Sequence, residues 1–324
     1  MILGALAGLR RAGVLGLNCR NSEYTLKYNK RRFYPLVDDK VLCKQRMKER
    51  QLPVPDLIAV VEFNRQASRI EELIGDNSEF VIKPANGSGG NGILVITDRK
   101  ADYFLDSDSK LVLKEDLAHH LTNVIGGLYS LGGQPDVAMI ESLVHFDPLF
   151  AQLTYHGVPD IRVIVFKGYP VMAMTRLPTR MSHGKANLHQ GAIGAGIDLA
   201  RGVTFGGVSG NNLVEVHPDT GHAIEGFRVP HWDRIMSMAA QCYEAVELGY
   251  LGVDIVLDRD HGPLILELNA RPGLNIQLAN RRGLRSRLDA VEALGSRHDL
   301  PDERVAWSIR NFGDPQTGLT SIAP

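Results

Sequence analysis

The chain has 324 residues, of which 44% are hydrophobic and 23% charged, the composition of an ordinary globular protein with room for more than one subdomain. Its 36 lysines and arginines are balanced by 37 acidic residues, so the net charge of −1 gives no overall electrostatic reason to expect nucleic-acid binding. The three cysteines are widely spaced without a Cys-x-x-Cys pair, which argues against a zinc site or a disulfide framework and favours a reducing, cytoplasmic location.

The N-terminal residues 1–9 form an apolar run that is too short to span a membrane, and its positive charges follow the run instead of preceding it. A secretory signal is therefore not expected. We expect this run to pack on the protein, because buried helical faces are more common than interfacial ones, and a weak contact with a membrane surface is the alternative. The aromatic and basic segment that follows, up to residue 37, has no clear periodicity and is expected to be an irregular arm.

Apolar periodicity and turn residues predict alternating helices and strands between residues 38 and 144. In chain order they are a helix at 40–51 capped by Asp38, a strand at 57–61, a helix at 64–74 ended by Gly75, strands at 80–84 and 93–96, a helix at 115–131 and a strand at 137–144. The apolar stripe of the helix at 115–131 includes Leu117, Leu121 and Leu128.

Glycines dominate the loop at 86–92, which lies between a strand ending in Lys83-Pro84 and a strand beginning at residue 93. The loop matches G-x-G-x-x-G, but a Rossmann fingerprint must open a helix, and here a β-branched strand follows. The backbone N–H groups of such a strand–loop–strand flap can approach nucleotide phosphates closely because no side chains intervene. The alternative is a flexible hairpin tip, against which the neighbouring Lys83 counts.

The second half of the chain is predicted to contain two hairpins and one long helix. The hairpins are expected at 160–166 with 170–176 and at 252–257 with 263–269, and the helix at 229–249, ended by Gly249. Arg162 and Arg176 lie in the first hairpin, where a charged side chain either snorkels or faces a site. The glycine-rich stretch at 182–212 is interpreted as one long loop, and a loop of that length is usually functional or mobile.

Oxygen-bearing side chains are expected to meet on the second hairpin. Glu267 and Asn269 share one face of their strand because side chains alternate along a strand, and the hairpin is placed to bring Asp254 alongside them. Three hard oxygen ligands on adjacent strands suit Mg²⁺, which proteins usually hold with one or two carboxylates plus substrate phosphates. A solvated polar face is the alternative interpretation of the same pattern.

The order of these parts resembles the ATP-grasp superfamily and, within it, the RimK-related alpha-L-glutamate ligase-like proteins. The motifs that carry the resemblance are Leu36-Val37-Asp38-Asp39-Lys40, Asn187-Leu188-His189-Gln190-Gly191-Ala192, Gly252-Val253-Asp254-Ile255 and Glu267-Leu268-Asn269-Ala270-Arg271-Pro272-Gly273. The resemblance covers residues 14–288 and implies an α+β ATP-grasp fold, in which two α+β subdomains clasp ATP between antiparallel sheets. It implies a reduced N-terminal pre-ATP-grasp region at 1–37, a first subdomain with the glycine flap at 38–145, a second with the metal site at 146–290, and a C-terminal tail at 291–324.

The resemblance also implies roles for individual residues. Lys40 and Lys83 would hold ATP phosphates. Arg162 and Arg271 would be catalytic, with Arg162 steadying an acyl phosphate. The set implied as Mg²⁺ ligands, with Mn²⁺ able to substitute, is Asp254, Glu267 and Asn269. The other residues implied in binding nucleotide or acceptor are Gly87, Ser88, Gly89, Gly90, Asn91 and Gly92 of the flap, Glu141, Ser142 and Leu143 near adenine, His145 or Asp147 at the ribose, and Arg176, Asn187 and His189.

The implied reaction is ATP-dependent ligation of a carboxylate and an amine through an acyl phosphate, with glutamate or a peptide among the substrates. The alternatives are an ATP-grasp kinase that stops after phosphoryl transfer and a nucleotide-binding regulatory module with a membrane-associated partner. ATP-grasp ligases usually place an additional α/β domain before the region of Lys40, and the 37 residues available here are too few for one, which leaves the acceptor open. We also expect small-molecule or peptide substrates, no nucleic acid, and a homo-oligomer.

Overall fold

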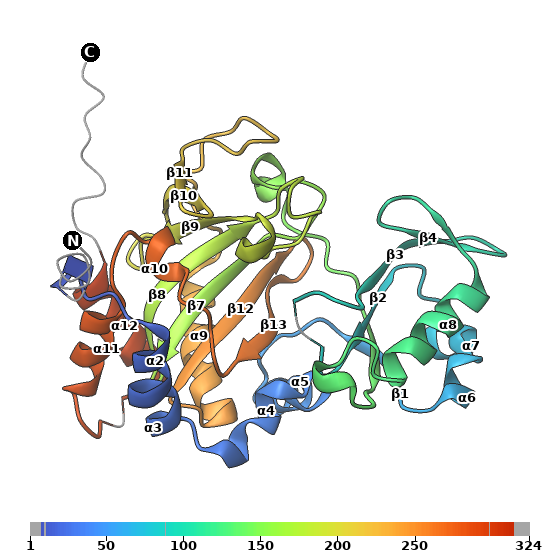
Figure 1. The fold of residues 1–324 in the computed structure, drawn as a ribbon, viewed down its shortest axis with the longest axis horizontal. Helices are drawn as coiled ribbons and strands as arrows, with labels where there is room; N and C mark the ends of the chain where they lie inside the picture. The colour runs from blue at the N-terminus through green and yellow to red at the C-terminus, as the bar shows by residue number, and fades with distance from the viewer. Residues whose placement is uncertain (1–7, 10, 88, 298, 314–324) are drawn as a thin grey trace. The chain divides into compact units, whose positions relative to one another are not determined.

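The computed structural model contains two antiparallel sheets, and each lies at the centre of its own structural unit (Figure 1). The structure describes residues 8–313 apart from residues 10, 88 and 298. Pro35–His145 form one unit, called the flap unit, and Met1–Tyr34 with Phe146–Pro324 form the other, called the hairpin unit. Most of the apolar run at 1–9, which we expected to pack or to touch a membrane, lies outside the described residues. No helix in the described part of the chain combines the length and apolar content needed to cross a membrane.

The flap unit is built on a six-stranded sheet whose strands lie in the order β1-β6-β2-β3-β4-β5. Neighbouring strands are antiparallel throughout. The strands are β1 (Leu57–Val61), β2 (Phe80–Pro84), β3 (Leu94–Arg99), β4 (Phe104–Asp106), β5 (Leu111–Val112) and β6 (Ala138–Glu141). The helices are α4 (Pro35–Asp38), α5 (Lys40–Glu49), α6 (Asn64–Ala67), α7 (Ile70–Ile74), α8 (Lys114–Ile125) and a 3₁₀ helix at Leu131–Gly133.

Helix α8 packs on this sheet because its apolar residues recur at helical spacing. Leu117 and Leu121 are fully buried on one stripe of the helix. They join Phe80 and Ile82 of β2 in one hydrophobic core. Because side chains alternate along a strand, Lys83 lies on the opposite face of β2 from this core, and it is buried there.

The hairpin unit is built on a seven-stranded antiparallel sheet in the order β11-β10-β9-β8-β7-β12-β13. The strands are β7 (Asp160–Phe166), β8 (Tyr169–Leu177), β9 (Ile193–Ile197), β10 (Thr204–Ser209), β11 (Asn212–Val214), β12 (Tyr250–Asp258) and β13 (Gly262–Asn269). The α-helices are α2 (Leu17–Cys19), α3 (Leu26–Tyr28), α9 (Trp232–Val246), α10 (Ile276–Ala279), α11 (Arg285–Glu292) and α12 (Pro301–Phe312). A π-helix spans Arg20–Thr25, and 3₁₀ helices span Arg31–Phe33, Pro148–Leu153 and Leu188–Gln190.

Helix α9 covers one face of the seven-stranded sheet, packing against β7, β8 and β12, and α12 packs against β8 and α9 (Figure 1). Helix α9 lies within the helix predicted at 229–249, and its Ile235, Met238 and Cys242 are all buried. Every residue of β7 and β12 is buried. Charged residues on these two central strands, Arg162 and Asp254 among them, are therefore enclosed by protein.

The N-terminal arm, which we expected to be irregular, is a run of short helical segments. Tyr24 and Tyr28 make edge contacts with Phe166 of β7, at 5.6 and 4.8 Å between ring centroids. Tyr24 also contacts Tyr250 of β12. Helices this short are unstable alone, so aromatic contacts with the sheet hold them and no apolar period is required in the sequence. The prediction for this segment was wrong for that reason.

The predicted helices also differ from the structure in detail. Asp39, not Asp38, caps α5, since its Oδ1 accepts hydrogen bonds from two backbone N–H groups of the first turn at 2.8 and 3.0 Å. The helix predicted at 64–74 is broken into α6 and α7. The next predicted helix ends at Ile125, so Leu128 is 66% exposed instead of belonging to the buried stripe.

The glycine-rich stretch at 182–212 is not one loop, because it contains β9 and β10. A Cβ at Gly196 of β9 would lie 2.7 Å from the carbonyl oxygen of Ala279 in α10. Glycine inside a strand often marks such a close approach of another backbone. The glycines that suggested a loop instead allow α10 to pack directly on the strand.

Replacing Leu117 by alanine is expected to lower the free energy of unfolding by about 2–5 kcal/mol, since the surrounding core closes only partly over the space that is left. Urea denaturation followed by circular dichroism measures the loss. Leu128→Ala is the control, because an exposed side chain is expected to change stability by no more than about 0.5 kcal/mol. Equal losses in the two variants would contradict this description of the core.

Candidate active site

A network of four charged side chains, of which three are buried and Arg176 is partly exposed, crosses the middle of the seven-stranded sheet. Arg162 of β7 lies directly across from Asp254 of β12, and Asp160 of β7 lies across from Arg176 of β8. Arg162 Nε donates to Asp254 Oδ1 at 2.6 Å, and Arg176 Nε donates to Asp160 Oδ1 at 2.6 Å. The Nη2 atom of each guanidinium completes the pair, and Arg176 Nη2 also donates to Asp254 Oδ2 at 2.8 Å. Asp254 therefore lies between two arginines.

The two carboxyl groups of this network are shifted in opposite directions. Burial acts to raise the pKa of Asp254, but the positive charges of Arg162 and Arg176 outweigh it and lower the pKa to about 2. At Asp160, burial outweighs the attraction of Arg176 and, with the negative charge of Asp254 nearby, raises the pKa to about 6. Asp254 is thus the firmly ionised member of the network, and it holds both guanidinium groups.

The predicted metal ligands follow on the neighbouring strand β13. Glu267 is paired directly across from Asp254, and Asn269 is paired across from Gly252. Side chains directly across from each other on antiparallel strands have Cβ atoms about 4.5–5.5 Å apart, so the two carboxyl groups lie close together. Two ionised carboxylates at such range repel each other, and a divalent cation between them would remove that repulsion. The donor set of two carboxylates and one amide oxygen therefore fits Mg²⁺.

The three predicted ligands are not equally open to a metal. Asp254 is fully buried and engaged by both arginines, whereas Glu267 and Asn269 are partly exposed. The Oδ1 atom of Asn269 accepts the backbone N–H of Arg271 at 2.8 Å, which orients the amide. Among the residues that the structure describes, no group of three or more His, Cys, Asp or Glu side chains is placed to hold a metal ion. A metal here would take Glu267 as its most accessible ligand and complete its coordination with phosphate oxygens.

In the flap unit, Glu141 of β6 lies between two lysines. Lys83 of β2 forms an ion pair with Glu141 Oε1, and the Nζ atom of Lys44 in α5 lies 2.7 Å from Oε2. All three side chains are buried, and Lys44 Nζ also donates to the carbonyl oxygen of Pro55 at 2.6 Å. Lys44 was not among the site residues predicted from the sequence. The signal that the sequence offered was the position of Lys44 one helical turn before the apolar Met47, which is fully buried in the structure.

Burial and pairing also shift the ionisation of this lysine–glutamate triad. Burial lowers the pKa of Lys44 to about 8, although the charge of Glu141 acts in the other direction. For Glu141, burial acts to raise the pKa, but the charges of Lys83 and Lys44 outweigh it and lower the pKa. With both lysines protonated, two positive charges face one negative charge, so the triad carries a net positive charge that suits an anion.

The glycine flap begins beside Lys40, whose Nζ donates to the carbonyl oxygen of Gly87 at 2.6 Å. Three glycines of the loop, at positions 89, 90 and 92, have φ of 68°, 75° and 74°, a conformation that residues with a side chain rarely adopt. A Cβ at Gly92 would also lie 2.5 Å from the ring of Tyr129. The loop therefore needs glycine for its backbone conformation as well as for access to a ligand.

The other predicted nucleotide contacts of the flap unit are distributed along the chain. Asn91 is exposed and Leu143 is partly exposed. The Oγ atom of Ser142 accepts a backbone N–H from the segment before β1 at 2.9 Å. His145 pairs with an acidic side chain of the same unit at 3.0 Å. Ser88 lies outside the described residues.

The remaining predicted residues of the hairpin unit lie outside its charge network. Asn187 Oδ1 accepts the backbone N–H of His189 at 3.0 Å, and within the described residues no hydrogen bond or ion pair joins either side chain to the network. Asp147 caps a 3₁₀ helix with its Oδ1 atom, at 2.9 Å. The guanidinium of Arg271 lies over the ring of Tyr34, 4.6 Å from its centroid.

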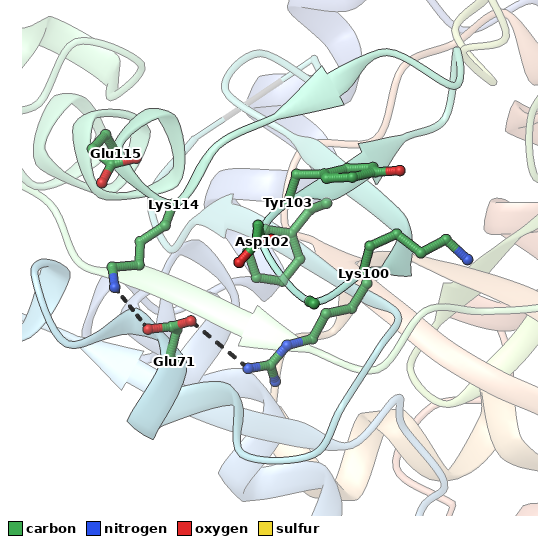
Figure 2. A pocket seen from close by; sticks show the side chains of 9 residues that line it. Glu71, Lys100, Asp102, Tyr103, Lys114 and Glu115 are labelled. Carbon is green, nitrogen blue, oxygen red and sulfur yellow. Dashed lines mark hydrogen bonds and ion pairs between the residues drawn. The ribbon is translucent and has the colours of Figure 1, made fainter.

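Figure 2 shows a surface pocket of about 150 Å³ in the flap unit, with Glu71, Lys100, Asp102, Tyr103 and Lys114 among its lining residues. None of the predicted nucleotide or metal residues lines it. Glu71 is already paired with Lys114 at 2.9 Å, as the dashed line in Figure 2 marks. Because none of the predicted residues lines the pocket, we assign no part of the candidate active site to it.

The model of one protein family, described as sugar-transfer associated ATP-grasp, matches residues 19–293 of the sequence. The chain belongs to this family. The matched region includes both the lysine–glutamate triad and the β12–β13 hairpin. The predicted ATP-grasp fold, with α+β units built on two antiparallel sheets, is confirmed.

Similar solved structures include the ATP-grasp ligase PsnB complexed with a minimal precursor, at 15% identity over 83% of this chain and 63% of that chain, with a TM-score of 0.45. D-alanyl-alanine synthetase A from Vibrio cholerae matches at 12% identity over 88% of this chain and 67% of that chain, with a TM-score of 0.48. D-cycloserine synthetase DcsG matches at 14% identity over 84% of this chain and 71% of that chain, with a TM-score of 0.42. The match thus spans less than two thirds of the PsnB chain. No curated protein matches the sequence.

The lowered pKa of Lys44 predicts a pH dependence of stability. The pKa is about 8 in the folded protein against 10.5 for an ordinary lysine, so between these values the unfolded chain binds more protons and stability rises with pH. Below the folded pKa both states are protonated, and the cost of burying the ammonium is fully present. The substitution Lys44→Met removes this dependence. The unfolding free energy of the wild type minus that of Lys44→Met should therefore rise by on the order of 1–3 kcal/mol between about pH 7.5 and about pH 10.

Denaturation at a series of pH values measures this difference. Lys48→Met is the matched control, because Lys48 lies on the same helix with a half-exposed side chain. A free-energy difference for Lys44→Met that stays constant with pH would contradict the lowered pKa.

Proposed function

We propose that the protein is an ATP-dependent carboxylate–amine ligase that uses Mg²⁺ and forms an amide through an acyl phosphate. The observation that carries the proposal is the pairing of Asp254 with Glu267 across the β12–β13 hairpin, next to Arg162 and Arg176. Carboxylates that hold a metal, with guanidinium groups beside them, stabilise the charge of phosphoryl oxygens during transfer. Membership of an ATP-grasp family supports ATP as the nucleotide.

In this proposal the flap unit binds the nucleotide. Lys83 and Lys40 bind phosphates as compact point charges. Glu141 keeps the Lys83 ammonium in place. We assign Glu141 this role in preference to a contact with adenine, because lysines engage both of its carboxylate oxygens. The glycine flap covers the phosphates and excludes water, which strengthens the local electrostatic interactions.

The hairpin unit is proposed to hold the metal and to stabilise the transferred group. Glu267 and Asn269 would bind Mg²⁺, which supplies neutralisation of phosphate charge. Arg162, held in position by Asp254, would steady the phosphoryl oxygens of the acyl phosphate. Arg271 follows directly on this segment and is proposed to contact the substrate.

The proposed reaction has two steps. A carboxylate oxygen of the acid attacks the γ-phosphorus, and the bond to the leaving oxygen breaks to give an acyl phosphate and ADP. The amine then attacks the acyl carbon, phosphate leaves with the electron pair of the C–O bond, and the nitrogen loses a proton to give the amide. No protein nucleophile is required, because positioning and charge neutralisation supply most of the acceleration.

The substrates are proposed on separate grounds. The family description associates its members with sugar transfer, and on this ground we propose that the carboxylate is carried by a sugar acid. The likeness of the Asn187–Ala192 and Glu267–Gly273 motifs to RimK-related ligases supports glutamate or a short peptide as the amine. A cytoplasmic location, a homo-oligomer and a membrane-associated partner stay predictions.

A substrate screen tests the function. ADP release is measured with ATP and Mg²⁺ for pairs of acids and amines, including uronic acids, glutamate and short peptides, and products are identified by mass spectrometry. ADP release that requires both an acid and an amine, with a product lighter than their sum by one water, supports ligation. A stable phosphorylated product formed without an amine would identify a kinase instead, and nucleotide binding without turnover under any pair would indicate a regulatory module.

Glu267→Gln is expected to reduce turnover on the order of 10²-fold or more while leaving the fold intact, because an amide oxygen is a weaker Mg²⁺ ligand than a carboxylate. Asp254 is unsuitable for this test, since removing it would leave the buried Arg162 without its acidic partner at a cost of about 3–5 kcal/mol. Glu225→Gln, at an exposed glutamate of the same unit, is the control. Wild-type activity in Glu267→Gln would remove the metal assignment.

Lys83→Ala is expected to weaken ATP binding about 10- to 100-fold, because a buried ammonium that would contact phosphate is lost. Calorimetric titration with a non-hydrolysable ATP analogue measures the affinity. Lys110→Ala, at an exposed lysine of the same unit, should bind as the wild type does. Unchanged affinity in Lys83→Ala would contradict its proposed role.

A further inference from the structure

The N-terminal arm is hydrogen-bonded to the backbone at the end of the β12–β13 hairpin. Asn29 is 2% exposed, and its Nδ2 donates to the carbonyl oxygens of Tyr250 at 2.7 Å and Ala270 at 3.1 Å, while its Oδ1 accepts the N–H of Tyr250 at 2.8 Å. The Nη1 atom of Arg20 donates to the carbonyl oxygen of Pro272 at 2.9 Å. These bonds fix the arm against the segment that directly follows β13.

The arm continues into residues 30–34, here called the basic turn, which lies against Arg271. The backbone N–H of Tyr34 donates to the carbonyl oxygen of Arg31 at 3.1 Å, so the turn is closed. The ring of Tyr34 lies beneath the Arg271 guanidinium, 4.6 Å from centroid to Cζ. The basic turn therefore adds its own cations to the one that follows the proposed metal ligands.

These cations are exposed and lack acidic partners. Lys30, Arg31, Arg32 and Arg271 all have exposed side chains, and none of them forms an ion pair with an acidic side chain in the described part of the chain. Other exposed cations of the hairpin unit do find a partner, as Lys27 does with a glutamate of α11. Like charges grouped within one turn repel each other, and a bound anion would remove that repulsion. The cluster is a local excess, since the chain as a whole has a net charge of −1.

Aromatic rings lie between these cations. Phe33 and Tyr34 are partly exposed, and each carries a guanidinium over its ring, that of Arg32 at 4.6 Å from the Phe33 centroid and that of Arg271 at 4.6 Å from the Tyr34 centroid. A ring of this kind can bury the apolar C–H face of a sugar, while neighbouring guanidinium groups pair with carboxylates in bidentate geometry. A site for a simple anion would need only the charges.

We propose that the basic turn and Arg271 form a binding site for a chain of acidic sugars, which brings the carboxylate to be ligated to the end of β13. The identity of this ligand as a substrate rests on the proposed function. The membership in a sugar-transfer associated family and the partly exposed rings favour an acidic sugar chain over an acidic peptide. Several carboxylates on one ligand match several cations on one turn, so binding should weaken as salt is raised.

The test uses the full-length protein and tetragalacturonate as the probe, with binding measured by calorimetry at low salt in the absence of ATP. The double variant Arg31→Glu with Arg32→Glu should lose about tenfold or more in affinity, because two attractive charges become repulsive. The control is Arg50→Glu with Arg65→Glu, the same change of charge at two exposed arginines of the flap unit. Both variants should keep the affinity for an ATP analogue, which shows that the fold is intact.

The outcomes separate this inference from the proposed ligation. Failure of the wild type to bind tetragalacturonate, or equal affinity in the two double variants, would overturn the site. Tetraglutamate binding as tightly as tetragalacturonate through the same arginines would replace the sugar chain with an acidic peptide. If tetragalacturonate binds through the basic turn but no pair of an acid and an amine leads to ADP release, the proposed sugar-binding site is supported and the proposed ligation is contradicted. If ligation proceeds with an acid whose KM is the same in Arg31→Glu with Arg32→Glu, ligation stands and the site is wrong.

Discussion

The charged part of the hairpin unit depends on the carboxylate of Asp254, which is enclosed between Arg162 and Arg176. Arg162 would have no acidic partner without it, and an unpaired buried charge costs several kcal/mol, while Arg176 would keep only Asp160. The central strands β7 and β12 are buried along their whole length, so apolar packing already accounts for the cohesion of this sheet. Buried ion pairs can often be replaced by apolar residues without loss of stability. Stability alone therefore does not account for a charge network on the strands beside Glu267, and this agrees with the role that we propose for the site.

The two charge clusters of the protein differ in the sign of charge that they leave uncompensated. In the flap unit, Lys44 and Lys83 face one carboxylate, which leaves a net positive charge. In the hairpin unit, two guanidinium groups balance two aspartates, and Glu267 on the next strand then adds a negative charge. A positive cluster suits phosphate oxygens and a negative one suits a divalent cation. Each unit, taken by itself, therefore suits an ion of the opposite sign.

What the sequence predicted well is what local patterns determine. The β12–β13 hairpin was predicted with Asp254 beside Glu267, because alternation of side chains and a single turn fix the register of two adjacent strands. Lys44 was missed because a lysine on a surface helix is usually solvated, and its burial depends on Glu141, far along the chain. The stretch at 182–212 was misinterpreted because glycine marks both loops and close backbone contacts. Only the packing of α10 against β9 distinguishes the two.

The structure of the N-terminal arm could not be predicted from the sequence for a different reason. This reason also bears on what the arm does. Arg20 and Asn29 bond to backbone carbonyl oxygens, which every residue has, so no complementary side chain in the sequence indicates where the arm attaches. Such bonds satisfy buried backbone groups and fix the arm. The cationic side chains of the basic turn stay exposed. A mobile segment would lose conformational entropy when it bound a ligand, whereas a segment already fixed loses less. The backbone that carries the exposed cations after Asn29 is therefore already fixed. A ligand that matches their charges can bind them with little reorganisation of the arm.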